Sequence, residues 1–216
     1  FDSEVLRSAS GDVFGRIYEY FLMKFAMQGA QDNGEFFTPP SLVQTIVNVI
    51  EPDHGVVFDP ACGCGNFLVI AYRELRLLEN ELIDKLFSKG GQSKGLLDIG
   101  TQSRVTVDQF YGLEIDPSAA HIAQVALWIT DHQLNLITAE RFGNTRPSIP
   151  LVKSAHIHQC NALRTDWAEV LAPGECSFIV GNPPFVGAKF QNDEQRADAA
   201  QVMGAIPNAG LLDYVC

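Results

Sequence analysis

The chain has 216 residues, of which 46% are hydrophobic and 19% charged, which is the composition of one globular domain with a substantial core. Its cysteines number five, and this odd number argues against a disulfide framework. The absence of any run of about 18 apolar residues argues against a membrane span. We therefore expect a cytoplasmic protein without membrane contact. The net charge is −11 and no stretch concentrates Lys and Arg, so nucleic acid would be held largely by charge from elsewhere.

Two helices are expected ahead of the first strand. Apolar residues recur close to every 3.6 positions in residues 12–26 and again in residues 38–50, where two prolines mark a helix start. We divide the chain accordingly into a helical lead-in, residues 1–54, and a core domain, residues 55–216. Because the chain starts at Phe1 and stops within an apolar stretch, we also expect it to be a piece of a longer protein.

Strands and helices alternate from residue 56 onward. The expected strands are residues 56–60, 107–116, 154–163 and 176–185, and the expected helices are residues 66–87 and 118–137. Alternation of this kind predicts an α/β fold with a parallel sheet. Two stretches, residues 89–104 and 140–154, are expected to be irregular connections, and residues 191–198 a polar lid or a solvated helix.

The segment DPACGCGNF, residues 59–67, follows the first strand and opens the first helix of the core. Gly63 and Gly65 would let a ligand come close to backbone N–H groups, and the small Cys62 and Cys64 would leave it space. A metal site is disfavoured because this Cys-x-Cys has no second pair of ligands at a suitable spacing. A thioredoxin-like redox pair is disfavoured because two residues normally separate its cysteines.

Acidic residues at two strand ends indicate what this loop binds. Asp59 ends the first strand and Glu114 the second, where an acidic side chain accepts hydrogen bonds from ribose hydroxyls. Phe67 and Leu68 stand near the place of the third glycine of G-x-G-x-x-G, and no Lys-Ser or Lys-Thr pair is present to hold phosphates. The loop therefore favours a nucleoside without phosphates over a dinucleotide or a triphosphate.

Five short motifs together resemble those of N6-adenine DNA methyltransferases. FDPACGCGNFL resembles their S-adenosylmethionine-binding loop, YGLEID their ribose-binding strand end and CNAL their cofactor-adenine segment. GNPPF resembles their catalytic tetrapeptide and GEFFTPP their remaining cofactor motif. The order is the gamma arrangement of type I modification subunits and of single-chain restriction–modification enzymes, and both subtypes remain open. The resemblance implies an incomplete Rossmann-like class I methyltransferase sheet after a helical lead-in.

The resemblance also implies roles for individual residues. Asn182 and Pro183 would accept the protons of the adenine amino group. Pro184 would stiffen the turn, and Phe185 would stack on the base after it flips out of the duplex. The implied cofactor contacts are Phe37, Thr38, Asp59, Pro60, Ala61, Gly63, Gly65, Asn66, Phe67, Glu114, Ile115, Asn161, Ala162 and Asn182.

Among these contacts, Phe37, Thr38 and Asp59 would lie at the methionine end of the cofactor. Glu114 would bind its ribose, and Asn161 its adenine. Several of these residues also fit purely structural roles. Thr38 suits a helix N-cap, Asn161 suits a turn, and Asn-Pro-Pro at a strand end is ordinary turn chemistry.

The function implied is that of a site-specific DNA adenine-N6 methyltransferase domain in a bacterial or archaeal restriction–modification system. It would use S-adenosyl-L-methionine, with no metal, and reach duplex DNA through a target-recognition domain or specificity subunit outside this chain. A fused nuclease or a restriction subunit is a further possible partner, and the isolated piece should have low activity. Lys189 and Arg196 are candidates for a phosphate contact.

Two other functions remain open on the same residues. The first is a protein glutamine N-methyltransferase, because Asn-Pro-Pro with an aromatic residue can also cradle a side-chain amide. The second is a non-catalytic module of a restriction enzyme that senses S-adenosylmethionine.

Overall fold

The structure is a computed structural model, and it describes residues 38–50, 55–90, 103–142, 154–204 and 214–215. The helix expected at residues 12–26 and the predicted cofactor contact Phe37 lie outside these residues.

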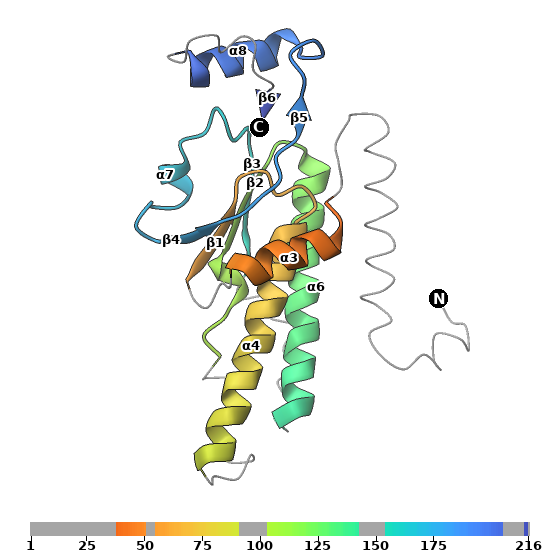
Figure 1. The fold of residues 1–216 in the computed structure, drawn as a ribbon, viewed down its shortest axis with the longest axis vertical. Coiled ribbons are helices and arrows are strands. Elements are labelled where there is room, and N and C mark those ends of the chain that lie inside the picture. Colours follow the sequence, from red (N-terminus) through yellow and green to blue (C-terminus); the bar gives the residue numbers. More distant parts are fainter. Residues whose placement is uncertain (1–37, 51–54, 91–102, 143–153, 205–213, 216) are drawn as a thin grey trace, which may run out of the picture. The chain divides into compact units, whose positions relative to one another are not determined.

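The centre of the fold is a parallel sheet of four strands in the order β3-β2-β1-β4 (Figure 1). The strands are β1 (Val56–Asp59), β2 (Phe110–Glu114), β3 (His156–Gln159) and β4 (Cys176–Ile179). This sheet confirms the predicted α/β class. Because the strands are parallel, their carboxyl ends all lie along one edge, where α/β proteins bind ligands.

A second, two-stranded sheet follows the Asn-Pro-Pro turn. It pairs β5 (Phe185–Val186) with β6 (Tyr214–Val215) in antiparallel fashion. The strand expected over residues 176–185 is thus two strands, because the two prolines between them supply no backbone N–H for a ladder.

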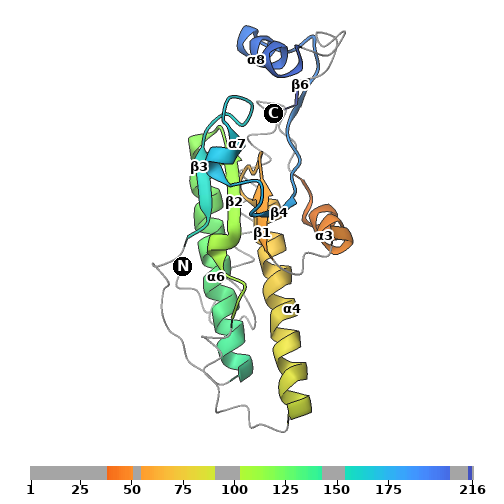
Figure 2. The same ribbon diagram turned by 90° about the vertical axis from the view of Figure 1, so that its left-hand side faces the viewer.

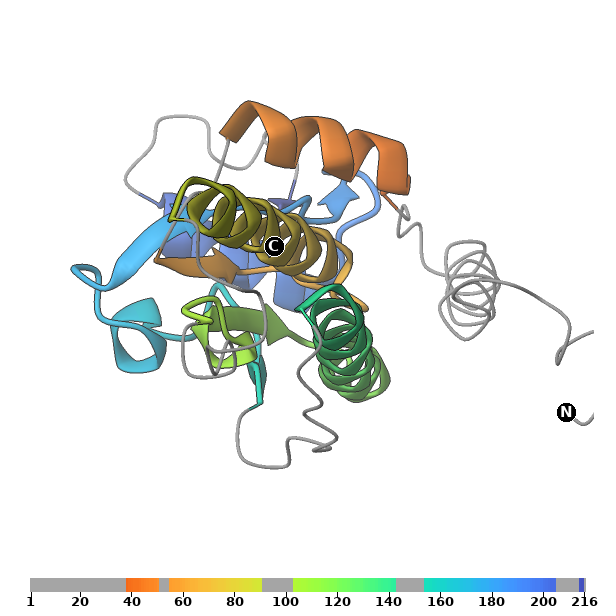
Figure 3. The same cartoon turned by 90° about the horizontal axis from the view of Figure 1, so that it is seen from below.

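Two long helices, α4 (Asn66–Gly90) and α6 (Pro117–Phe142), run side by side and pack on the sheet (Figure 2). The shorter α3 (Pro40–Ile50) packs on α4, so that α4 lies between α3 and α6 when the molecule is seen from below (Figure 3). Two still shorter or more polar helices follow, α7 (Trp167–Val170) and α8 (Asp193–Met203). No helix in the described ranges has both the length and the apolar character needed to cross a bilayer.

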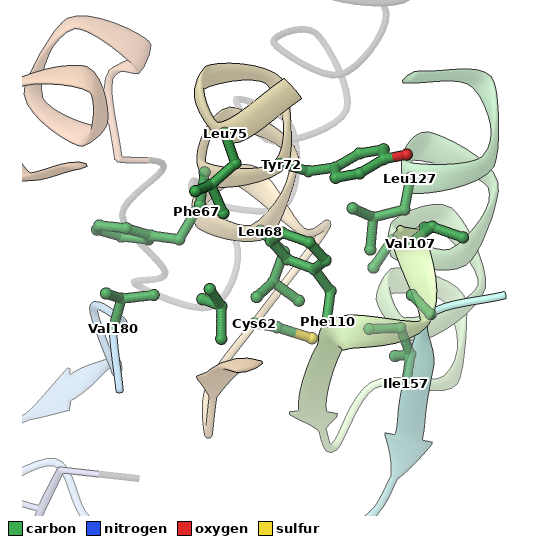
Figure 4. Packing of buried hydrophobic residues seen from close by; sticks show 14 of the residues in the cluster. Cys62, Phe67, Leu68, Tyr72, Leu75, Val107, Phe110, Leu127, Ile157 and Val180 are labelled. Carbon is green, nitrogen blue, oxygen red and sulfur yellow. The ribbon is translucent and has the colours of Figure 1, made fainter. Parts of the chain in front are cut away.

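The main core lies between the long helices and the sheet (Figure 4). Leu68, Tyr72 and Leu75 of α4 follow the helical repeat and are buried, as the apolar spacing of residues 66–87 predicts. Tyr72 meets Phe110 of β2 edge to face, with ring centroids 5.0 Å apart. Each such side chain contributes about 1.5–3 kcal/mol by leaving water, so this packing fixes the strand ends relative to α4.

The compact unit that contains the sheet runs from Thr38 to Cys216. It includes α3, because Val43 and Val47 of this helix are buried in the main core. The sequence assigned this helix to the lead-in of residues 1–54, and that division of the chain stays a prediction.

Element boundaries differ from expectation at two places near β2. Val107–Gln109 forms a 3₁₀ turn, called η1, ahead of the strand, and the Gln109 side chain accepts a hydrogen bond from the Thr106 N–H at 2.7 Å. Beyond the strand, Asp116 caps α6 by accepting the Ala119 N–H at 2.7 Å. Asp116 therefore has the role of a helix N-cap.

Candidate active site

The loops that follow the four strands are joined to one another by backbone hydrogen bonds. Each bond runs from a backbone N–H in the loop after one strand to a backbone carbonyl near the carboxyl end of a neighbouring strand. The donor and acceptor pairs are Val180 N to Phe58 O, Cys62 N to Leu113 O, and Cys160 N to Glu114 O, each at 2.9 Å. The predicted site residues of all four strand ends are thereby brought to one edge of the sheet.

The glycine loop is held by the carboxylate of Glu114. Its Oε2 accepts the Gly63 N–H at 2.9 Å, and its Oε1 accepts the Asp116 N–H at 2.8 Å. Gly63 has φ +54°, and a Cβ there would meet open space. Since each carboxylate oxygen has a second lone pair, Glu114 is oriented by the protein yet still able to accept hydrogen bonds from a diol.

The small residues Gly65 and Cys62 of the loop pack closely against neighbouring elements. Gly65 has φ +88°, and a Cβ there would lie 3.1 Å from the Cβ of Ala123 on α6. Cys62 is buried in the main core (Figure 4), and a Cβ on Gly112 would lie 2.8 Å from its sulfur. The expectation that Cys62 is small to leave space for a ligand is therefore wrong, because the limit on its size comes from β2.

Asp59 is the most unusual charged residue at the sheet edge, with only 1% of its surface exposed. Its Oδ1 accepts the Ala61 N–H at 3.0 Å, while its buried Oδ2 has no hydrogen-bond partner among the described residues. Burial, opposed in part by the Ala61 N–H and supported by the Glu114 charge, raises the pKa of Asp59 to about 7. Gly181 must be glycine, since a Cβ there would lie 2.6 Å from Asp59 Oδ1.

These residues fit a nucleoside that carries a cationic amino-acid end. A buried carboxylate oxygen without a partner is costly, and an ammonium group beside Asp59 would offset that cost. Glu114 offers acceptors for ribose hydroxyls. Ile115, 58% exposed just beyond β2, offers an apolar surface for a planar base.

The Asn-Pro-Pro turn begins directly after Gly181 and reaches across to the start of α3. Asn182 Nδ2 donates a hydrogen bond of 3.0 Å to Thr38 Oγ1, although the two residues are 144 positions apart. Thr38 is buried, whereas Asn182 is exposed. The first turn of α3 closes on the Pro39 carbonyl, which accepts from the Leu42 and Val43 N–H groups.

Beyond the turn, Pro183 and Pro184 are half-buried and Phe185 is 61% exposed. Pro60 and Ala61 of the glycine loop are also half-buried, as is Asn66, the first residue of α4. The side chain of Phe67 lies in the main core (Figure 4), so any contact that it makes with a ligand would be made by its backbone.

Asn161 has its side-chain amide engaged within the protein. Its Oδ1 accepts the Leu163 N–H at 2.9 Å, as in an Asx turn, and its Nδ2 donates to Asp198 Oδ2 at 3.1 Å. The adjacent Ala162 packs in a second, smaller core around Phe58. The predicted contacts of Asn161 and Ala162 with the cofactor adenine stay predictions.

Asp198 is a residue that sequence reasoning missed. It lies on the polar helix α8, yet it is buried and also accepts from Arg164 Nε at 2.7 Å. The flanking small residues in RADAA are the only signal of close packing there, and they are weak. Gly181 was missed as well, although its place between β4 and the turn marks a close approach.

The candidate phosphate contacts, Lys189 and Arg196, are both exposed. Arg196 lies 3.9 Å from Asp193 in a pairing that water screens strongly. Their role stays a prediction. Within the ranges that the structure describes, no three His, Cys, Asp or Glu side chains are grouped as metal ligands would be.

Most of the chain matches one known protein family in sequence. The family model described as "MmeI, DNA-methyltransferase domain" matches residues 46–216. The chain belongs to this family.

Curated relatives of this MmeI-family domain carry related names. The chain is 42% identical to the methylase subunit of the type I restriction enzyme HindI from Haemophilus influenzae. The match covers 96% of this chain and 37% of that protein. The chain is 40% identical to DNA methyltransferase A of Bacillus subtilis over 73% of this chain and 18% of that protein. The domain thus spans 37% or less of the length of these two relatives.

A solved structure of the type IIL restriction-modification enzyme MmeI in complex with DNA also matches. The TM-score is 0.70 and the sequence identity 42%, over 95% of this chain and 26% of the MmeI chain. Together with the parallel sheet, this likeness confirms the predicted Rossmann-like class I methyltransferase fold. With the family model, it also confirms the predicted resemblance of the chain to the DNA methyltransferases of restriction–modification systems.

Proposed function

We propose that this domain transfers the methyl group of S-adenosyl-L-methionine to the N6 amino group of an adenine flipped out of duplex DNA, within a restriction–modification enzyme. Membership of a DNA-methyltransferase family supports the reaction class. The observation that carries the proposal is the contact between Gly181 and Asp59, because it sets the Asn182 turn beside the carboxylate of the glycine loop.

The Asn-Pro-Pro-Phe turn would supply the hydrogen-bond acceptors that make the adenine amino nitrogen a better nucleophile. The exocyclic nitrogen of adenine is a poor nucleophile because its lone pair is delocalised into the ring. Asn182 Oδ1 and the Pro183 carbonyl oxygen would each accept one amino proton, which localises the lone pair on nitrogen. Acceptors that are already fixed in place stabilise the transition state without reorganising.

Pro183, Pro184 and Phe185 would hold the turn and the base. The two prolines fix φ and carry no N–H, so the turn presents acceptors to the base and keeps its shape. Phe185 is 61% exposed and offers its ring to the flipped adenine. Stacking of a base on an aromatic ring is worth about 1–3 kcal/mol, which offsets part of the cost of leaving the duplex.

The cofactor would be held by the polar groups at the strand ends. Asp59 suits its ammonium group, Glu114 its ribose hydroxyls and Ile115 its base, while Gly63 allows close approach of the backbone. Bound there, S-adenosyl-L-methionine supplies a methyl group made electrophilic by the positive sulfur. Strand ends tied to one another would keep donor and acceptor in line, which lowers the entropic cost of the reaction.

DNA would be engaged chiefly by parts of the enzyme outside this chain. A net charge of −11 leaves little positive surface to neutralise phosphates, so a target-recognition domain or specificity subunit would supply most of that charge. Lys189 and Arg196, which are both exposed, would add local phosphate contacts. A fused nuclease or a restriction subunit is a further partner, and the bacterial or archaeal cytoplasm is the compartment.

Family membership argues against a protein glutamine methyltransferase. The remaining alternative is a module that binds the cofactor without using it. Methyl transfer from labelled S-adenosylmethionine to DNA by the full-length enzyme separates the two, since a sensing module would leave the DNA unlabelled.

The test of the proposal is Asn182→Ala in the full-length enzyme. Loss of one fixed acceptor should lower kcat by roughly 10²- to 10³-fold, with little change in cofactor affinity. Asn48→Ala is the matched control, because Asn48 is an exposed asparagine on α3 whose side chain bonds only to Gln44 in the described part of the chain. DNA methylation by Asn182→Ala at the wild-type kcat would refute the proposal.

A further inference from the structure

The hydrogen bond between Asn182 and Thr38 determines which end of the Asn182 amide is left for a substrate. The amide has a donor end, Nδ2, and an acceptor end, Oδ1. Its donor end is committed to Thr38 Oγ1 at 3.0 Å. The acceptor end is the one that the proposed chemistry requires at the adenine amino group.

The hydroxyl of Thr38 has a second capacity that this bond does not use. A hydroxyl accepts through its lone pairs and donates one hydrogen at the same time. By accepting from Asn182, Thr38 keeps its O–H hydrogen to donate, and no acceptor for that hydrogen is found in the described part of the chain. Because Thr38 is buried, an anionic oxygen of a bound ligand would be a strong acceptor for it.

We propose that Thr38 is a positioning residue that couples cofactor binding to the orientation of the Asn182 amide. Its hydroxyl holds Nδ2 and so directs Oδ1 toward the adenine, while its own hydrogen is donated to the amino-acid carboxylate of the cofactor. The two hydrogen bonds form a chain, and each polarises and strengthens the other. This inference rests on the proposed function and adds to it the coupling between the two substrates.

The physical basis of the coupling is the ease with which the terminal amide of an asparagine side chain rotates. The terminal torsion of an asparagine is broad and roughly two-fold, so an unanchored amide samples both orientations. In the wrong one, an NH₂ group would face the adenine amino group and neither would have an acceptor. Once the Thr38 hydroxyl donates its hydrogen to the cofactor carboxylate, it can only accept from Asn182, and this removes the ambiguity before the base arrives.

The kinetic signature separates positioning from simple cofactor contact. If Thr38 only bound the cofactor, Thr38→Val would raise the cofactor Kd and leave kcat at saturation unchanged. If Thr38 also orients Asn182, kcat at saturating cofactor falls too, by roughly 3- to 10-fold, the range that one hydrogen bond supports.

The experiment uses the full-length enzyme and its methylation site, with cofactor binding measured by calorimetry and kcat measured at saturating cofactor and DNA. Thr38→Val should show the fall in kcat, and Thr38→Ser, which restores the hydroxyl, should recover most of it. Thr45→Val is the matched control, because the hydroxyl of Thr45, on the helix α3 that follows Thr38, bonds to the Ser41 carbonyl at 2.8 Å and should not affect kcat.

A double-mutant cycle completes the test. In an Asn182→Ala background, Thr38→Val should have no further effect on kcat, because no amide is left to orient. Wild-type kcat in a folded Thr38→Val enzyme, or equal effects of this change in both backgrounds, would overturn the coupling, while the lowered kcat of Asn182→Ala would still support the proposed function. Thr38→Ala replaces Thr38→Val if the latter fails to fold, as judged by thermal unfolding.

Discussion

Between α4 and α6 the protein buries polar side chains that bind mainly to one another, whereas at the strand ends it buries polar groups that keep unused hydrogen-bonding capacity. The helix pair contains Tyr72, Arg76, Asn80, Asp131, Asn135 and Thr138. The second group consists of Asp59 and the partly buried Glu114 at the strand ends, with Thr38 just ahead of α3. Both groups are polar and both lie beside the main core.

The helix-pair cluster is largely closed on itself. Arg76 donates to Asn135 Oδ1 at 3.0 Å, Asp131 accepts from the Tyr72 hydroxyl, and Asn80 bonds to Thr138 at 3.1 Å. One Arg76 nitrogen, Nε, has no hydrogen-bond partner among the described residues and lies 3.8 Å from the Glu79 carboxylate in an ion pair. Such a network fixes the packing of two helices and offers little to a ligand.

The strand-end groups are held in place by the protein but incompletely satisfied. Asp59 Oδ2 has no partner among the described residues, and Thr38 has a hydrogen to donate. The comparison suggests that unused capacity at an oriented polar group is a better guide to function than burial or charge alone.

The largest effect is expected from opening the closed cluster with Asp131→Ala. This change leaves the buried Tyr72 hydroxyl without its acceptor and removes the carboxylate that lies 3.9 Å from Arg76, so the free energy of unfolding should fall by about 3–5 kcal/mol. Urea unfolding of the full-length enzyme measures it, with Glu81→Ala on the exposed side of α4 as control. A loss of cofactor affinity at unchanged stability would show that this cluster belongs to the site.

A smaller effect, with a characteristic pH dependence, is expected for Asp59→Asn. Because the folded-state pKa of Asp59 is raised from 3.8 to about 7, the folded protein binds a proton in this window that the unfolded chain has released. Stability therefore falls as the pH rises. Between pH 5 and pH 8 the wild type should lose about 3 kcal/mol relative to Asp59→Asn. Urea unfolding measures the two free energies. The same stability difference between the wild type and Asp59→Asn at pH 5 and at pH 8 would contradict this prediction.

The same carboxyl gives a test of cofactor binding. An ammonium group beside Asp59 would lower its pKa again, so the wild type should release part of a proton on binding S-adenosylmethionine near pH 7. Calorimetry in buffers of different ionisation enthalpy measures the release, and Asp59→Asn should abolish it.

The smallest effect is expected at the junction of α8 with the Asn161 loop. Asp198→Asn weakens the bond to Arg164, whose side chain is 49% exposed, so the change should cost only about 0.5–1 kcal/mol. Amide hydrogen exchange in α8 should be faster in Asp198→Asn than in the wild type, with exchange in α4 unchanged. Exchange in α8 that matches wild type would show that Asp198 does not hold this helix.

Much of the fold follows from local patterns. The strand ends Asp59 and Glu114 could be predicted because a change from a two-residue to a 3.6-residue period marks where each strand stops. The parallel order of strands then brings them together. The helix α4 was predicted for the same reason, since Leu68, Tyr72 and Leu75 repeat along one face.

What the sequence could not supply are contacts between distant segments. The bond from Asn182 to Thr38 spans 144 positions, and no local pattern records it. The inward direction of Cys62 depends on Gly112 of the next strand, and the burial of Asp198 depends on the Asn161 loop. Each of these is a consequence of packing, which becomes visible only when the strands are side by side.

The most direct test of the account is the affinity of the full-length enzyme for S-adenosylmethionine in Glu114→Gln, measured by calorimetry. A glutamine keeps one acceptor oxygen and loses the charge, so the Gly63 and Asp116 N–H groups and the ribose hydroxyls would compete for it. The account predicts that binding weakens by roughly 10- to 100-fold, as expected for hydrogen bonds to a charged group. Unchanged affinity in a folded Glu114→Gln enzyme would contradict the claim that the strand ends form the cofactor site.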